Sequence, residues 1–308
     1  MRFPALALLA ALVFPFFVTA ETPANIITVE HQMGKTRVPV RPERVVVTGT
    51  GALDMLDAFG IEPIAVTKEY LPGYLSKYKD DKFASSGTLF EPDFEGIFSL
   101  KPDLIIVGPR SSEQFDELSK IAPTLVFAPD TTANLSYWQG TQQLWRTLGR
   151  VFAIEDRVEA KIAELDAQFR AIADKNRAEQ NNALLVMSSG KNITAFGAPS
   201  RFSAVFRDFG FMDAAHVTTQ SSHGELVSFE FIKQTNPQHL FIIDRDKVVN
   251  KGKSTTHEQF DNALVKATDA YKNHAVTYPD IAAWYTSASG VTATEIMIRD
   301  VKQNLHIQ

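Results

Sequence analysis

Residues 94–105 read FEGIFSLKPDLI and residues 229–240 read FEFIKQTNPQHL, so one short sequence unit occurs twice in this chain. The two copies share five positions at a constant offset of 135: Phe94, Glu95, Ile97, Pro102 and Ile105 match Phe229, Glu230, Ile232, Pro237 and Leu240. Arg110 and Arg245 are related by the same offset. Each copy predicts a short helix that leads through a proline into a buried strand. The pattern indicates an internal duplication, although unrelated α/β units also resemble one another.

Apolar runs and helical patterns alternate on both sides of the repeated unit. Strand-like, β-branched runs occupy residues 45–47, 64–66, 104–107, 124–127, 184–187 and 240–243. Helical spacing over residues 52–59 and 202–209 ends in each case at a glycine, Gly60 and Gly210. Strands that alternate with short helices favour parallel pairing, and they predict an α/β fold.

A long helical stretch separates the two halves. Residues 138–152 form one predicted segment, and residues 154–179 form a second one without proline or glycine. At 1.5 Å per residue the second segment would be about 39 Å long. We therefore predict two Rossmann-like α/β lobes that are joined by a single long α-helix, with a ligand cleft between them and only small hinge motion. The expected domains are a signal peptide at 1–20, an N-terminal lobe at 21–152, a linker helix at 153–180 and a C-terminal lobe at 181–308.

The composition excludes several classes of function. The chain has 308 residues, 44% of them hydrophobic and 22% charged, which is typical of a globular protein. It contains no cysteine, so disulfides, thiolate catalysis, zinc ribbons and iron–sulfur clusters are excluded. The formal net charge of −5 argues against nucleic-acid binding as the main function, because phosphate neutralisation needs a basic surface.

The first 20 residues, MRFPALALLAALVFPFFVTA, have the three regions of a secretory signal peptide. Arg2 supplies the positive charge, residues 5–18 supply the apolar run, and residues 18–20 supply a cleavage site. A membrane anchor is the alternative, but the apolar run is shorter than the about 20 residues that span a bilayer. No cysteine follows that could carry a lipid. We therefore expect a periplasmic protein that diffuses freely, without membrane insertion.

Three arginines fall at loops that follow predicted strands. Arg110 and Arg245 each come shortly after a strand, and Arg201 lies where the first helix of the second half begins. Such loops line the ligand cleft of a two-lobed α/β protein, and a guanidinium fork suits anionic oxygens. The three arginines therefore predict a cationic pocket. The alternative is that each one pairs with a nearby carboxylate, and Asp244 and Asp246 flank Arg245.

Two further loop residues are candidate ligands for a metal ion. His223 lies in a polar loop, and Tyr285 precedes the last predicted helix. Neutral imidazole and phenolate are good ligands for Fe(III), although a single loop histidine or tyrosine carries little weight. His216 lies seven residues before His223, which leaves a zinc-type site open. The sequence has no HExxH, GxSxG, phosphate-loop or GxGxxG signature, which argues against an enzyme.

Six segments together carry a family resemblance: residues 41–46 (RPERVV), 87–95 (GTLFEPDFE), 101–106 (KPDLII), 121–124 (IAPT), 200–202 (SRF) and 284–285 (WY). On these segments the mature chain resembles the periplasmic solute-binding proteins of ABC importers for iron siderophores (class III, or cluster A). Within that group it is similar to the catecholate branch, the enterobactin and vibriobactin type. The fold of that family is two α/β lobes joined by one long helix.

The resemblance also implies site residues. In catecholate binders an arginine triad faces the anionic ferric complex, and a histidine and a tyrosine complete the iron coordination when the siderophore supplies only four oxygens. One surface glutamate per lobe docks on arginines of the membrane permease, although a role in helix capping is the alternative for these glutamates. By motif the triad falls on Arg110, Arg201 and Arg245, the iron ligands on His223 and Tyr285, and the docking residues on Glu95 and Glu230.

The sequence thus predicts a periplasmic, monomeric binding protein without enzymatic activity and without a permanently bound cofactor. Its cargo would be Fe(III) in the form of a siderophore complex, and its partner would be an inner-membrane ABC permease. The nearest alternative is the same fold with another cargo, such as a hydroxamate siderophore, haem or cobalamin. A direct zinc or manganese binder and a secreted hydrolase are less favoured, because clustered ligands and a nucleophile motif are missing.

Overall fold

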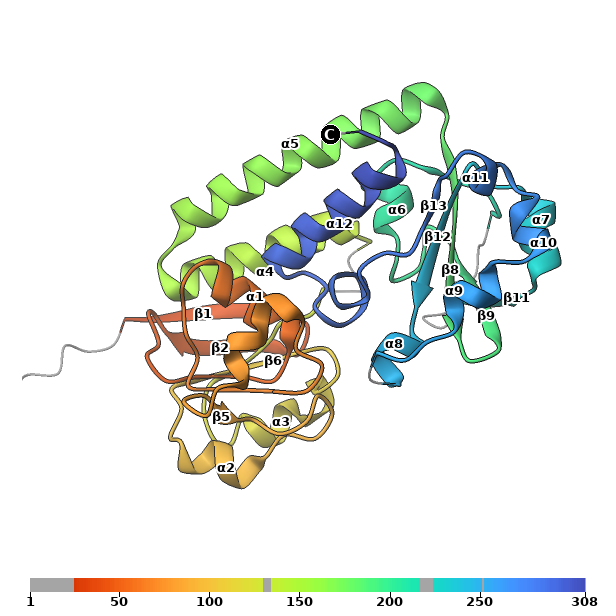
Figure 1. The fold of residues 1–308 in the computed structure, drawn as a ribbon. Helices are drawn as coiled ribbons and strands as arrows, with labels where there is room; N and C mark the ends of the chain where they lie inside the picture. The colour runs from red at the N-terminus through yellow and green to blue at the C-terminus, as the bar shows by residue number, and fades with distance from the viewer. Residues whose placement is uncertain (1–24, 130–133, 217–223, 251, 308) are drawn as a thin grey trace, which may run out of the picture.

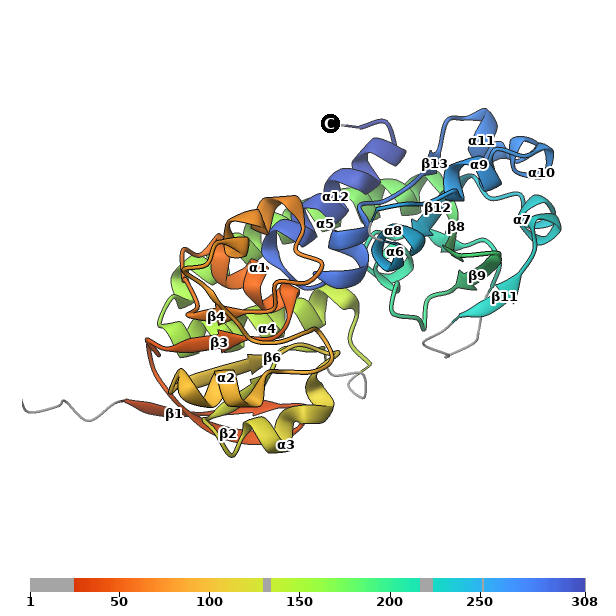
Figure 2. The ribbon, with the colours of Figure 1, turned by 60° about the horizontal axis from the view of Figure 1, so that its bottom comes forward.

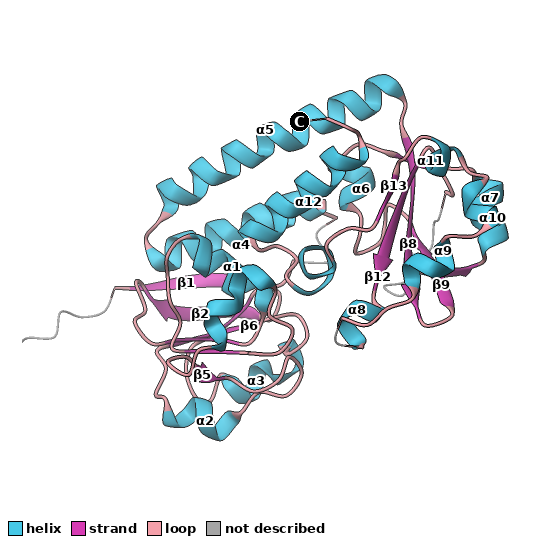
Figure 3. Cartoon of the chain, viewed as in Figure 1, coloured by secondary structure: helices cyan, strands magenta, loops and turns pink. Residues whose placement is uncertain are grey.

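The protein is described from a computed structural model, which covers residues 25–129, 134–216, 224–250 and 252–307. Two β-sheets lie at opposite ends of one long helix, α5 (Glu155–Glu179), as Figure 1 and Figure 3 show. The predicted fold class, two α/β lobes with a long connecting helix, is confirmed. None of the described helices combines the length and the apolar composition that a membrane crossing requires.

The first sheet is wholly parallel, as the sequence predicts. Its strand order is β5–β4–β3–β6–β7, which places β3 and β6 at the centre. An antiparallel hairpin, β1 and β2, precedes it and was not predicted. The strands are β1 (Ile26–His31), β2 (Gly34–Pro39), β3 (Val45–Val47), β4 (Ala65–Val66), β5 (Ala84–Ser85), β6 (Leu104–Val107) and β7 (Thr124–Val126). The α-helices of this part are α1 (Thr50–Ala58), α2 (Phe94–Ser99) and α3 (Phe115–Leu118).

The second sheet is mixed, which corrects the prediction of parallel pairing. Strands β8, β10, β12 and β13 pair in parallel, but β9 pairs antiparallel with β8 because the chain turns back at Gly190, whose φ is +59°. Strand β11 pairs antiparallel with β9 at the edge of the sheet. The strands are β8 (Asn182–Ser189), β9 (Asn192–Phe196), β10 (Met212–Asp213), β11 (Glu225–Val227), β12 (His239–Asp244) and β13 (Val276–Thr277). The short helices around them are α6 (Ala204–Arg207), α7 (Phe229–Thr235), α8 (Asp246–Val249), α9 (Thr256–Phe260), α10 (Ala263–Lys266) and α11 (Asp269–Lys272).

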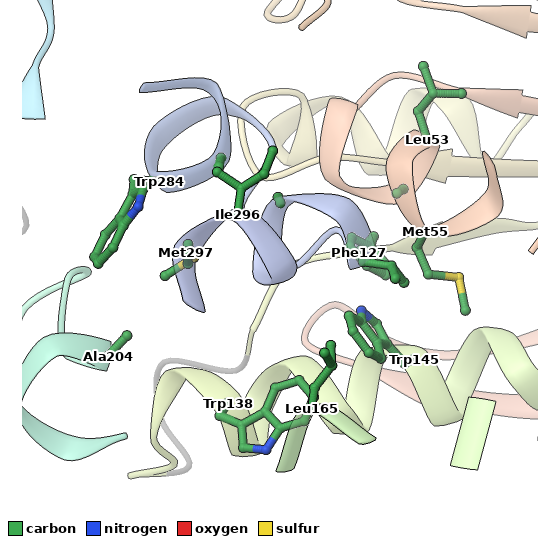
Figure 4. Close-up of a cluster of buried hydrophobic side chains, with 14 of the residues drawn as sticks. Leu53, Met55, Phe127, Trp138, Trp145, Leu165, Ala204, Trp284, Ile296 and Met297 are labelled. Atoms are coloured by element: carbon green, nitrogen blue, oxygen red, sulfur yellow. The ribbon is translucent and has the colours of Figure 1, made fainter. Parts of the chain in front are cut away.

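Three helices lie between the sheets rather than the long helix alone. Helix α4 (Tyr137–Phe152) and the C-terminal helix α12 (Val291–Asn304) both pack against α5, and α12 also contacts α1 (Figure 2). Figure 4 shows Trp138 and Trp145 of α4 and Met297 of α12 as members of one cluster of buried hydrophobic side chains. One hydrophobic cluster runs from the first sheet through these helices to one face of the second sheet. The two lobes therefore share a core, and the predicted domain boundaries remain a proposal.

The two copies of the repeated unit share the same helix cap and the same left-handed turn. Asp93 caps α2 by accepting a hydrogen bond from the Gly96 amide, and Ser228 caps α7 in the same way at its third residue. Each unit then reaches its proline through a left-handed residue, Lys101 (φ +48°) in the first and Asn236 (φ +44°) in the second. These equivalent caps and turns favour the internal duplication.

Two segments that carry the family resemblance have a structural role. The Asp103 carboxylate accepts hydrogen bonds from the Glu43 and Arg44 amides at 2.7 and 2.9 Å. The Arg44 guanidinium in turn donates to the carbonyl groups of Leu100 and Lys101. The segments at 41–46 and 101–106 thus hold the start of β3 against the start of β6.

Candidate functional site

The loop that carries Arg110 is positioned by a close contact between two glycines. Gly49 follows β3 and Gly108 follows β6, and a Cβ atom on Gly49 would lie 2.6 Å from the Gly108 Cα. Only glycine permits this approach. The two loops at the carboxyl ends of the central strands therefore lie together, and Arg110 emerges from them half-buried.

Tyr285 lies on a short π-helical segment, Ala282–Thr286, that is fastened to the first lobe. The Thr50 hydroxyl donates to the Thr286 carbonyl at 2.6 Å, and the Trp145 indole donates to the Ser289 carbonyl at 2.7 Å. Single-turn π segments are frequent at functional sites. Although Tyr285 comes late in the sequence, it is therefore held beside the loops of the first lobe.

The three predicted arginines converge on this one tyrosine. Arg110 Nη2 and Arg201 Nη2 both donate to the Tyr285 carbonyl, at 3.2 and 3.4 Å. Arg245 Nε donates to the Tyr285 hydroxyl at 3.2 Å. The guanidinium carbons of Arg201 and Arg110 also lie 4.5 and 5.2 Å from the centre of the Tyr285 ring, within cation–π range. Residues that are far apart in the sequence and come from both lobes thus form one cationic cluster.

No described carboxylate lies within 4.0 Å of any of these three guanidinium groups. The two acids that flank Arg245 form hydrogen bonds with other residues instead. Asp244 accepts hydrogen bonds from Ser254 and Thr256, and Asp246 accepts one from the Gly190 amide. The alternative of an ion pair between Arg245 and its neighbours is therefore wrong, and the cluster keeps its positive charge for another partner.

The arginines also change the acidity of Tyr285. Partial burial by itself raises the pKa of the phenol, but the hydrogen bond from Arg245 and the positive charges of Arg201, Arg245 and Arg110 oppose it. The net result is a pKa below the ordinary value of tyrosine. The arginines thus favour the deprotonated form of the Tyr285 hydroxyl.

The other predicted site residues lie elsewhere or cannot be placed. His223 lies outside the described residues. Among the residues that the structure describes, no three histidine or acidic side chains form a group that could hold a metal ion. The zinc-type alternative pairs His216 with His223 and is therefore not tested. Glu95 and Glu230 lie exposed in the first turns of α2 and α7, at equivalent positions of the two repeats.

Sequence reasoning missed one residue of the cluster. The Ser189 hydroxyl accepts a hydrogen bond from Arg245 Nη1 at 2.9 Å, which fixes the second edge of that guanidinium. Ser189 is the last residue of β8, directly beside the end of β12. A polar residue at the carboxyl end of a predicted strand is the signal that could have identified it.

Arg110 follows β6, Arg245 follows β12 and Arg201 lies in the loop after β9, so the fold brings arginines of both lobes to one place, as in a two-lobed binding protein. The sequence profile of the family described as "Periplasmic binding protein" matches residues 45–281, and the chain belongs to that family. Family membership confirms the prediction of a solute-binding protein of a transport system rather than an enzyme.

Individual relatives agree with this assignment. The petrobactin-binding protein YclQ of Bacillus subtilis is 41% identical over 293 residues, which cover 93% of this chain and 90% of YclQ. The periplasmic catecholate-siderophore binding protein VctP of Vibrio cholerae is 56% identical, with a TM-score of 0.87 over 91% of this chain and 100% of VctP. The siderophore binding protein BauB, solved with two acinetobactin molecules and ferric iron, is 33% identical, with a TM-score of 0.83 over 92% of this chain and 100% of BauB.

Proposed function

We propose that this chain is the periplasmic binding protein that captures a ferric catecholate siderophore and delivers it to an ABC permease of the inner membrane. The observation that carries the proposal is the convergence of Arg110, Arg201 and Arg245 on Tyr285 without a described carboxylate partner. The names of the relatives, which are binding proteins for petrobactin, for catecholate siderophores and for ferric acinetobactin, support the same class of cargo.

The charge of the cargo matches the charge of the cluster. A ferric ion with three catecholate groups carries three negative charges, and one with two catecholate groups carries a single negative charge. Burying such an anion is costly unless positive groups compensate it. Three guanidinium groups supply that compensation, and their planar faces can also stack on catechol rings.

The remaining roles follow from the same proposal. With a tetradentate siderophore two iron positions stay open, and the Tyr285 phenolate and the His223 imidazole would fill them. Glu95 and Glu230 would dock on arginines of the permease. Residues 1–20 would be removed on export, and the mature protein would act as a monomer whose iron is cargo rather than a permanent cofactor.

Fluorescence titration tests the proposal. Trp284 directly precedes Tyr285, so a ferric catecholate at the arginine cluster should quench tryptophan emission. We expect saturable quenching by ferric catecholates at micromolar concentration or below. Absence of binding at those concentrations would refute the catecholate assignment, and binding of haem, cobalamin or a ferric hydroxamate in its place would identify the alternative cargo.

A further inference from the structure

We propose that Tyr285 positions the three arginines and so assembles the cationic site before cargo binds. The inference rests on the proposed function and adds a positioning residue to the proposed site. It gives Tyr285 a role that is separate from iron coordination.

Three guanidinium groups close together repel one another, and in an empty site they would turn apart towards solvent. Acidic side chains usually prevent this, but here no described acid lies within ion-pair distance. Tyr285 offers three kinds of partner instead. Its carbonyl oxygen accepts from Arg110 and Arg201, its ring faces both of them, and its hydroxyl accepts from Arg245.

Arg201 depends most on the ring. Its side chain is exposed, and its guanidinium carbon lies 4.5 Å from the Tyr285 ring centre and 5.4 Å from that of Phe202. Its single hydrogen bond to Tyr285, at 3.4 Å, is long. Removal of the ring would therefore release Arg201 more than it releases Arg245, which is also held by Ser189 at 2.9 Å.

Tyr285 is itself fixed well enough to position other groups. Its neighbour Trp284 is 3% exposed, and the Trp284 indole donates to the Asp300 carboxylate at 2.9 Å. The Asp280 carboxylate accepts from the Ala283 amide at 2.9 Å. With Thr50 bound to the Thr286 carbonyl as well, the segment is held on both sides of Tyr285.

A chromium(III) tris-catecholate complex separates the two roles of Tyr285. Chromium(III) exchanges its ligands so slowly that a phenolate cannot enter its coordination sphere during a titration, while its charge and shape match those of the ferric complex. We compare the wild type, Tyr285→Phe, Tyr285→Ala and, as a matched control at an exposed tyrosine, Tyr271→Phe. Any effect of the Tyr285 variants on chromium binding must then act through the arginines.

We expect Tyr285→Ala to weaken binding of the chromium complex about tenfold or more, and Tyr285→Phe, which keeps the ring, to weaken it a few-fold. The control should bind like the wild type. In the ligand-free protein, the NMR resonance of the Arg245 Nε–H should shift in Tyr285→Phe and stay in place in Tyr271→Phe.

Two results would overturn the inference. One is chromium binding by Tyr285→Ala that equals the wild type. The other is an unshifted Arg245 Nε–H resonance in Tyr285→Phe, a variant that keeps the packing of the ring. If the wild type itself binds neither the ferric nor the chromium complex, the proposed function fails instead, so the two failures are distinguishable.

Discussion

At the scale of single residues, the site is a cluster of like charges organised around one aromatic side chain. Arg110, Arg201 and Arg245 approach Tyr285 from three loops. Their positive charge lowers the pKa of the phenol and leaves the guanidinium groups available to an anion.

Neutralising the arginines should affect the more highly charged cargo most. Arg110→Gln and Arg245→Gln each remove one charge-assisted interaction, so we expect affinity for a ferric tris-catecholate to fall by about 1.5–3 kcal/mol and for a bis-catecholate by less. Titrations of both complexes measure this. Arg37→Gln, at a distant arginine of β2, is the control. Equal losses for both cargoes would contradict the charge argument.

Loss of the proposed iron ligands should instead affect the less highly charged cargo most. In His223→Ala and Tyr285→Phe we expect affinity for a ferric bis-catecholate to fall more than affinity for a tris-catecholate, because only the former leaves iron positions open. The visible charge-transfer band of an iron phenolate should disappear in Tyr285→Phe. If both variants lose affinity for the two complexes to the same extent, His223 and Tyr285 are not iron ligands.

At the scale of elements, the buried Asp54 and the half-buried Asp208 join the lobes through helix ends. Asp54 of α1 accepts from the Thr292 and Ala293 amides at the start of α12. Asp208, just after α6, accepts from the Trp138 amide at the start of α4. A residue of the first lobe, Asp54, thus caps α12, and a residue of the second lobe, Asp208, caps α4. A carboxylate at a helix N-terminus is favourable, but burial raises the pKa of both groups to about 6.

These pKa values predict a pH dependence of stability. Between the ordinary pKa of aspartate and about 6 the folded protein binds more protons than the unfolded chain, so these two groups add stability as the pH falls from 7 towards 5. We expect the free energy of unfolding in urea to rise by on the order of 1–2 kcal/mol for each group over that interval. Asp54→Asn should flatten the slope, and an unchanged slope in that variant would contradict the assignment.

The contact between Gly49 and Gly108 predicts the effect of a single methyl group. In Gly49→Ala the new Cβ would meet the Gly108 backbone, so the loops must separate and Arg110 must move. We expect a loss of stability of about 1–3 kcal/mol and weaker binding of ferric catecholates. Gly73→Ala is the matched control, since nothing lies within 4 Å of its Cβ position. Melting temperature and affinity that match those of the control would show that the contact is unimportant.

At the scale of the whole molecule, the sequence repeat predicts the two-lobed arrangement, but it does not predict every strand or every residue of the site. Buried apolar runs, Pro102 and Pro237, and the long stretch without glycine or proline were sufficient to predict the two lobes and α5. The hairpin of β8 and β9 was missed because its turn, Gly190–Lys191, has no strong two-residue hairpin motif, and its second strand, NITAF, is short. Ser189 was missed because serine is common at strand ends.

Helices α2 and α7 carry the predicted docking residues on opposite lobes. Glu95 and Glu230 are exposed, and Glu95 is not paired with any described cation. We expect the double charge reversal Glu95→Lys and Glu230→Lys to abolish siderophore uptake in cells while leaving siderophore affinity unchanged. Reversal of two other exposed glutamates, Glu113→Lys and Glu258→Lys, should leave both intact. Normal uptake by the first double variant would refute the docking role.

The continuous core also predicts how far the lobes move. Helices α4, α5 and α12 fill the space between the sheets, and one hydrophobic cluster includes both sheets. Sliding or opening of the lobes would expose part of that cluster to water, at roughly 25 cal/mol per Å². We expect the radius of gyration from small-angle X-ray scattering to change by less than about 1 Å when a ferric siderophore binds. A larger decrease of the radius of gyration would show that the lobes close about a hinge, which would contradict this prediction.

The core that α4, α5 and α12 share between the lobes affects how the empty and the loaded protein compete for the transporter. If the spacing of α2 and α7 is the same with and without cargo, the permease meets nearly the same outline in both cases. Empty protein should then occupy the transporter as a competitor of the loaded form. We therefore expect iron uptake to pass through an optimum as this protein is overproduced at a fixed siderophore concentration, since beyond that point each additional molecule blocks more transporters than it loads.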